Sequence, residues 1–426
     1  MNELTRLIKE DMKPALGVTE PGAIAFAVST AREHINGDVM RVELKLNSGM
    51  FKNAFTCGIP GISQVGNYHA AALGAVAADP KKGLECLDGI TDEEKERALK
   101  MVKDGRIFVE MSEITSRIFI EARVTGEDSE AVVTIRDAHT NIVKITENGK
   151  TVFEREQKEE QGETEDHRIH RYTLEQLCEY ARTVPVEEIA FVKEAFKMNE
   201  ELLMEGINSP ETTFAHYLLA ANGGKLVSED EQKTASLFCN AAIEARVIGL
   251  SRPAMSITGS GAHGIIATMP LYAAFKVNGY TEEALLRATA LSCLICMYIK
   301  EYSGKLSAFC GCAIAAGTGM ACGLVSLRGG DVKVMEKVIC NMAGSITGMI
   351  CDGGNQGCTM KGVVAVDAAY QSVNMAMSGV SVDPVHGING RTPEETMRNM
   401  GLIASPGMVG TEKTIVEILE GKTTAV

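Results

Sequence analysis

The sequence predicts an α+β protein that is mostly helical, with a smaller α+β domain inserted into a helical domain. Between residues 38 and 173, apolar and polar residues alternate, as in DVMRVELKLN, which is typical of half-buried strands. From residue 174 onward, apolar residues recur at spacings of three and four, which is typical of helices. We therefore expect N-terminal helices over 1–37 that pack on the helical domain, an α+β domain over 38–173 and the helical domain over 174–426.

Local signals place the elements within these segments. The N-terminal segment should hold two helices separated by the loop GVTEPG, Gly17 to Gly22. In the α+β domain, the turn ENGK predicts a hairpin between two strands, and the loop GIPG, residues 58–61, precedes a helix of small residues. The charged run 154–168 indicates a solvated loop or linker.

Composition narrows the class of protein. A chain of 426 residues, 45% apolar and 23% charged, can bury a sizeable core. The net charge of −14 argues against a nucleic-acid partner, because phosphates would be repelled. The apolar runs are broken before about 18 residues, so no membrane span is expected. Without a disulfide framework or a signal peptide, the sequence predicts a cytoplasmic protein with a small-molecule partner, and it leaves homo-oligomer formation open.

Eight of the twelve cysteines lie between residues 293 and 358, and their settings differ. Four of these eight, and two earlier cysteines, lie in apolar helical runs, where a thiol behaves as a small hydrophobic group. We assign core packing to Cys178, Cys239, Cys293, Cys296, Cys322 and Cys340.

The other four cysteines between residues 293 and 358 predict a metal centre. Cys351 and Cys358 bracket the tight turn DGGNQG, and Cys310 and Cys312 flank Gly311 at an expected helix start, where a thiolate is favoured. The spacing is not that of a closed four-ligand zinc site. Three thiolates, the pair and one of the other two, would hold an iron–sulfur cluster with one iron open for Lewis-acid chemistry.

Five motifs resemble those of a known family: ALGVTEPGAIAFA, GIPG, MSITGSGAHGIIATMP, YIKEYSGKLSAFCGCAIAAGTG and NMAGSITGMICDGGNQGCTMK. Together they resemble the L-cysteine desulfidases, which are related to the alpha region of iron–sulfur L-serine dehydratases, and the resemblance spans essentially the whole chain. It implies a lyase of amino acid catabolism that splits L-cysteine into sulfide, ammonia and pyruvate without pyridoxal phosphate. It also implies that Cys310, Cys351 and Cys358 hold a [4Fe-4S] cluster with three cysteine ligands and one open iron.

The sequence departs from the family pattern where substrate should bind. Val18 replaces the cysteine that the family uses as base, and valine cannot take a proton. His263 stands in the substrate loop TGSGAHG, and we take it as the candidate catalytic base because histidine titrates in a suitable range. Candidate substrate-binding residues are Thr258, Ser260, Gly261 and His69.

The backbone around these residues suggests how a substrate would be held. Amides of residues 258–264 would cradle a carboxylate, since glycines allow close approach. An ordinary glycine turn is the structural alternative. We expect Thr19 and Glu20 to lie near the cysteine motifs, where the domains meet, and the last helix to close over the pocket.

Three other functions stay open at this point. The same cluster would support an L-serine or other β-hydroxy acid dehydratase, and the release of sulfide separates that activity from a desulfidase. A non-catalytic, cluster-containing redox sensor is the alternative of another class, although no DNA-binding helix-turn-helix or basic stripe supports it. A pyridoxal-phosphate lyase would perform the same elimination, but no sequence feature favours it.

Overall fold

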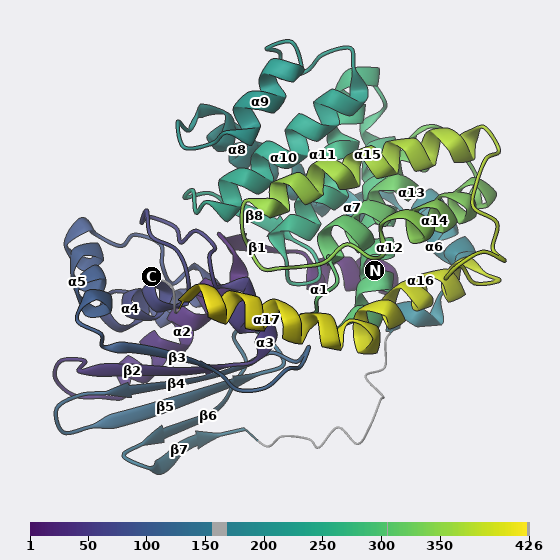
Figure 1. Ribbon diagram of the computed structural model, residues 1–426. Helices are drawn as coiled ribbons and strands as arrows, with labels where there is room; N and C mark the ends of the chain where they lie inside the picture. The colour runs from purple at the N-terminus through teal and green to yellow at the C-terminus, as the bar shows by residue number, and fades with distance from the viewer. Residues whose placement is uncertain (156–167, 305, 424–426) are drawn as a thin grey trace.

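The computed structural model describes residues 1–155, 168–304 and 306–423. It confirms the α+β class, with a six-stranded sheet at one end and a larger helical part beside it (Figure 1). Most of the charged run expected to be a linker, residues 156–167, lies outside the described residues. No helix in the described part of the chain is long and apolar enough to cross a membrane.

The described residues form helices, strands and short 3-10 or π segments. The helices are α1 (Glu3–Asp11), α2 (Thr19–Glu33), α3 (Ser48–Asn53), α4 (Asn67–Val76), α5 (Asp92–Lys103), α6 (Leu174–Thr183), α7 (Val186–Ile189), α8 (Lys193–Asn208), α9 (Phe214–Ala221), α10 (Glu231–Val247), α11 (Gly261–Asn278), α12 (Glu282–Ser303), α13 (Gly317–Leu327), α14 (Val332–Ile346), α15 (Gly357–Met377), α16 (Pro393–Leu402) and α17 (Val409–Thr423). The strands are β1 (Lys13–Leu16), β2 (Arg41–Leu46), β3 (Ile107–Met111), β4 (Phe119–Thr125), β5 (Glu130–Arg136), β6 (Ile142–Glu147), β7 (Lys150–Glu154) and β8 (Pro253–Ser256). The short segments are η1 (Pro80–Glu85), η2 (Arg168–Arg171), η3 (Ala190–Val192), η4 (Cys312–Ala316) and η5 (Ile403–Gly407).

The sheet has the strand order β3-β2-β4-β5-β6-β7, and all neighbours are antiparallel except β2 and β3. Burial alternates along β2, β4 and β5, as the sequence predicted, so one face is buried. The expected hairpin joins β6 to β7, with Asn148 and Gly149 both at positive φ, as a tight hairpin turn requires. Helices α2 and α4 cover the buried face (Figure 1).

Helix α2 begins earlier than the sequence suggested. The run GVTEPG was expected to be a loop, but its last four residues form the first turn of α2, after Val18 at the N-cap. Pro21 is tolerated there because the first amides of a helix have no intrahelical acceptor. The helix is buried along most of its length and lies against α4, β4 and β5, whereas α1 contacts α12. The boundaries at residues 38 and 174 stay predictions.

Closely packed helices form the helical part. Helix α10 contacts α8, α11 and α15, and α12 contacts α11 and α13. Small residues allow the close approach: a Cβ atom at Gly319 would lie 2.3 Å from the carbonyl oxygen of Ser292 on α12. Four of the cysteines assigned to the core, Cys239, Cys293, Cys296 and Cys322, are fully buried here.

Two contacts join the ends of the chain to segments distant in the sequence. Strand β1 pairs with β8 in a separate antiparallel ladder, which fixes the N-terminal segment beside the loop before α11. Helix α17 runs between the sheet and the helical part and contacts α3 (Figure 1). Buried Lys52 of α3 and Glu412 of α17 form an ion pair with Nζ and Oε2 2.7 Å apart.

Candidate functional site

Backbone pairing brings the two cysteine motifs together. Phe309 and Ile350 form an isolated antiparallel bridge. On its two sides, the amide of Cys310 donates to the Met349 carbonyl at 3.0 Å, and that of Cys351 donates to the Ala308 carbonyl at 2.6 Å. Cys310 and Cys351 therefore lie on adjacent extended segments.

The third thiol comes from the start of the next helix. Cys358 is the second residue of α15, and its Sγ lies 3.4 Å from the carbonyl oxygen of Gly353 in the intervening turn. The chain thus folds back between the two cysteines, as DGGNQG predicted.

The three thiols influence one another electrostatically. Burial, followed by the nearby Cys351, raises the pKa of Cys358 to about 12. Burial and then Cys310 among its neighbouring thiols raise the pKa of Cys351. The pKa of Cys310 is raised by its contact with the Cys312 thiol and by burial. Without a metal these groups stay protonated at neutral pH, so a metal that binds them must displace protons.

Two lysines lie near the three thiols. Lys361, which pairs with Asp352, lowers the pKa of all three thiols, and Lys52 lowers that of Cys351. Lys52 also donates to the carbonyl oxygen of Ser307 at 3.0 Å, close to the first cysteine motif. These ammonium groups would offset the negative charge of bound thiolates.

The donor set fits an iron–sulfur cluster. Soft thiols select iron–sulfur clusters over hard cations such as Mg²⁺. Across the described residues, no three metal-ligating side chains converge on a single ion. A cluster does not require that, because each thiolate binds a different iron. Cys310, Cys351 and Cys358 would hold the group.

Cys312 points to different neighbours. Its thiol contacts Cys310, but it otherwise affects the pKa of Lys300, Cys239 and Cys296 on the helices behind. Cys312 is not among the main causes of the raised pKa of Cys351 or of Cys358. These neighbours favour Cys310 as the third ligand, and the choice stays a prediction.

The N-terminal motif reaches the cysteines through Asn53. The Asn53 amide donates to Glu20 Oε1 at 2.9 Å, and the Cys351 thiol donates to Asn53 Oδ1 at 3.9 Å. A Cβ atom at Gly354 would lie 3.0 Å from Val18 Cγ1. The hydroxyl of Thr19 donates to the Gly259 carbonyl at 3.3 Å, which ties this motif to the loop before α11.

His263 is buried beside the first cysteine motif. Its Nδ1 lies 2.5 Å from Thr258 Oγ1 and 3.3 Å from the Ile257 carbonyl oxygen. That carbonyl can only accept, so we assign the proton to Nδ1 and the lone pair to Nε2. A Cβ atom at Gly311 would lie 2.7 Å from Nε2, so the lone pair faces the segment between Cys310 and Cys312. Burial and then Lys300 lower the pKa of His263 to about 3, so the ring is neutral at pH 7. A pKa this far below 7 makes His263 a weaker base than the ordinary histidine that the sequence predicted.

The other candidates in this loop have different surroundings. The amide of Thr258 donates to Asp11 Oδ2 at 2.5 Å, and its hydroxyl donates to the Ile257 carbonyl at 2.7 Å. These contacts favour a role for Thr258 in holding His263. Ser260 is the N-cap of α11 without a side-chain capping bond, and Gly261 is the first residue of that helix. The loop is thus shorter than the expected run 258–264, because α11 starts inside it.

His69 lies on α4, away from these contacts. Its Nδ1 bonds the carbonyl oxygen of Val65 at 2.7 Å in an exposed part of the structure. Its assignment to substrate binding stays a prediction that no contact with the cysteine motifs supports.

Two residues of the site carried no recognised signal in the sequence. Cys57 is fully buried, and its Cβ would lie 3.2 Å from a Cβ atom at Gly354. Burial and then Glu20 raise its pKa. Arg246 is buried on α10, and it influences the pKa of both Cys57 and His263. Cys57 directly precedes GIPG, and Arg246 is the only arginine of the small-residue run FCNAAIEARVIG, which are the signals that could have identified them.

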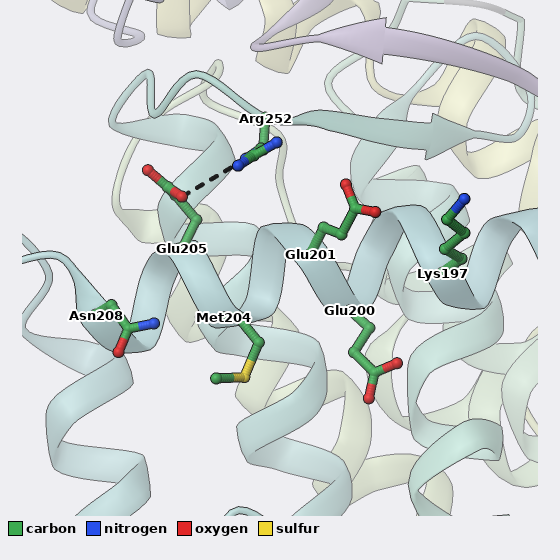
Figure 2. A pocket seen from close by; sticks show the side chains of 7 residues that line it. All are labelled: Lys197, Glu200, Glu201, Met204, Glu205, Asn208 and Arg252. Atoms are coloured by element: carbon green, nitrogen blue, oxygen red, sulfur yellow. Dashed lines mark ion pairs between the residues drawn. The ribbon is translucent and has the colours of Figure 1, made fainter.

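A surface hollow of about 490 Å³ follows α8 (Figure 2). Figure 2 shows three glutamates, Glu200, Glu201 and Glu205, along the helix, with Arg252 paired to Glu205 at 3.7 Å. None of the residues that line it is among those gathered at the cysteine motifs.

Comparison with known proteins shows the family of the chain. Residues 81–417 match the family described as serine dehydratase alpha chain. A UPF0597 protein from Clostridium botulinum strain Langeland is 40% identical over 98% of both chains. UPF0597 proteins from Caldanaerobacter subterraneus subsp. tengcongensis and Clostridium tetani are 35% and 32% identical, each over 98% of this chain and 97% of the relative. The chain therefore belongs to the serine dehydratase alpha chain family and to the UPF0597 proteins.

Proposed function

We propose that this protein is an iron–sulfur-dependent lyase that catalyses α,β-elimination on a small amino acid. The observation that carries the proposal is the convergence of four motifs. They are the two cysteine motifs with their three thiols, the start of α11 with the Nε2 lone pair of His263, and the N-terminal motif. Membership of the serine dehydratase alpha chain family suggests the same class of reaction.

The cluster, the first amides of α11 and His263 each contribute one part of the elimination. When bound, a [4Fe-4S] cluster with one open iron supplies a Lewis acid that polarises the β-substituent of the substrate. The first amides of α11 hold the substrate carboxylate, since they have no intrahelical acceptor. His263 Nε2 takes the Cα proton, the bond from Cβ to its substituent breaks and a Cα–Cβ double bond forms. The enamine then tautomerises and hydrolyses to a keto acid and ammonia.

Two substrates follow from two observations. The matched family favours L-serine, from which the β-hydroxyl leaves as water and pyruvate and ammonia remain. The motifs that resemble those of desulfidases favour L-cysteine, from which sulfide leaves instead of water. We place L-serine first because the family match covers residues 81–417 directly.

The test is anaerobic purification followed by assays of iron, acid-labile sulfide, pyruvate and free sulfide in one sample. We expect about four irons per chain. Pyruvate from L-serine would support the first substrate, and sulfide with pyruvate from L-cysteine would support the second. A fully loaded protein that turns over neither amino acid would contradict the proposed activity, and a protein that binds no iron under these conditions would contradict the cofactor.

Replacing His263 with asparagine should lower kcat by about 100-fold, because a positioned general base contributes at least that much. The asparagine amide can still donate to the Ile257 carbonyl, so the loop should keep its fold and iron content should not change. His216→Asn is the matched control, because that ring bonds only the Ile207 carbonyl in an exposed region of α9. A loss of kcat in His69→Asn, with none in His263→Asn, would move the role of base to His69.

A further inference from the structure

Arg246 is a buried cation without an anionic partner among the described residues. Its exposed fraction is 4%, and its Nε is buried without a hydrogen-bond partner. In the described part of the chain, none of the ion pairs includes its guanidinium group. A buried charge without a partner is expensive, so a protein keeps one where a ligand supplies the opposite charge.

The nearest acidic residue on the same helix already accepts hydrogen bonds from other groups. Glu244 is fully buried, and its Oε1 accepts from the amides of Thr213 at 2.8 Å and Phe214 at 3.1 Å. Its Oε2 accepts from the amide of Ala215 at 2.7 Å. Glu244 therefore caps the start of α9 and does not neutralise Arg246.

The guanidinium group lies against the start of α11. A Cβ atom at Gly261 would lie 2.6 Å from Arg246 Nε and 3.1 Å from its Cδ. Only glycine at this position lets the side chain approach so closely. The amides of residues 261–263 precede the first helical acceptor, and the N-cap Ser260 provides no side-chain oxygen to them. A planar cation and free amides thus share one small region.

Arg246 lies close to residues of the candidate site. The positive charge of Arg246 acts to lower the pKa of both Cys57 and His263, so the guanidinium group lies close to both residues. The loop that starts at Cys57 also packs on the end of α10, where the Gly58 amide donates to the Val247 carbonyl at 2.8 Å.

We propose that Arg246, together with the first amides of α11, binds the α-carboxylate of a small amino acid. An arginine binds a carboxylate through two parallel N–H donors, and a helix start favours an anion, so the pair would fix both the position and the orientation of the substrate. The assignment rests on the proposed function for the identity of the ligand, but the binding itself can be measured without turnover.

The experiment uses L-alanine, which has the carboxylate but no leaving group, and L-alaninamide, which lacks the carboxylate. Both are titrated calorimetrically into the iron-loaded full chain. We expect Arg246→Met to weaken L-alanine binding by about 10- to 150-fold, the range for hydrogen bonds to a charged group. The same change should leave the weaker binding of L-alaninamide unaltered. Gly261→Ala should weaken L-alanine binding as well, since its Cβ would displace the guanidinium group.

The matched control is Arg252→Met, which removes an exposed arginine paired to Glu205 and should bind L-alanine as the wild type does. Thermal unfolding separates binding from structure. Without ligand, Arg246→Met should not lower Tm, because it removes an unpartnered buried charge, whereas a purely structural arginine would lower it.

The possible outcomes test the carboxylate assignment separately from the proposed function. Wild-type affinity for L-alanine in Arg246→Met, equal losses for L-alanine and L-alaninamide, or no L-alanine binding by the wild type would overturn the carboxylate assignment. Arginine-dependent binding of L-alanine in a protein that turns over neither L-serine nor L-cysteine would uphold the assignment and contradict the proposed reaction.

Discussion

Replacing Cys358 with alanine is expected to abolish both iron binding and turnover. Cys358 is the ligand that α15 contributes, and its thiol lies within electrostatic reach of Cys310 and Cys351. Two remaining thiolates cannot hold a cluster that requires three from the protein. Iron and acid-labile sulfide analysis of the anaerobically purified variant should fall from about four irons per chain to nearly none.

Two further variants make this result specific. Cys178→Ala removes a half-buried thiol that contacts Met335, outside the group of three, and should keep the iron of the wild type. Cys312→Ala tests the choice between the two neighbouring cysteines, and we expect it to keep the cluster. Full iron content in Cys358→Ala, or its loss in Cys312→Ala but not in Cys310→Ala, would contradict the ligand assignment.

Most of the secondary structure could be predicted from local patterns in the sequence. Alternation along DVMRVELKLN predicted β2, because a strand buried on one face repeats every two residues. The start of α2 was misplaced because Pro21 indicates a break in most positions but is tolerated in a first turn. The order of strands in the sheet depends on contacts between distant segments, which local periodicity does not contain.

The site was predictable only where its residues belong to motifs. Cys351 and Cys358 stand seven positions apart around glycines, so their convergence can be inferred from the turn between them. Arg246 and Cys57 could not be placed in the same way. One lies in a helix that looks like an ordinary core helix, and the other lies almost 200 residues earlier in the sequence. Their proximity results from the packing of the loop at Gly58 on the end of α10.

Replacing Lys52 with methionine is expected to destabilise the protein by about 3–5 kcal/mol, the cost of breaking a buried ion pair. The Lys52 ammonium is the partner of Glu412 Oε2, and the side chains are 0% and 6% exposed. Methionine would leave the carboxylate of Glu412 buried without a counter-ion, and its Oε1 already lacks a hydrogen-bond partner. For a chain of this length, the change corresponds to a fall in Tm of roughly 3 to 6 °C in calorimetry.

The control and the double variant test the cause of this loss. Lys333→Met breaks an exposed pair with Glu336, whose atoms are 2.9 Å apart, and should change stability by less than about 1 kcal/mol. Lys52→Met combined with Glu412→Leu removes both charges and should recover most of the lost stability, since apolar side chains can replace a buried pair at little cost. The pair joins residues 360 positions apart and holds α17 against α3, beside the cysteine motifs. A Tm of Lys52→Met equal to that of Lys333→Met would mean that packing of α17, and not this ion pair, keeps the C-terminal helix in place.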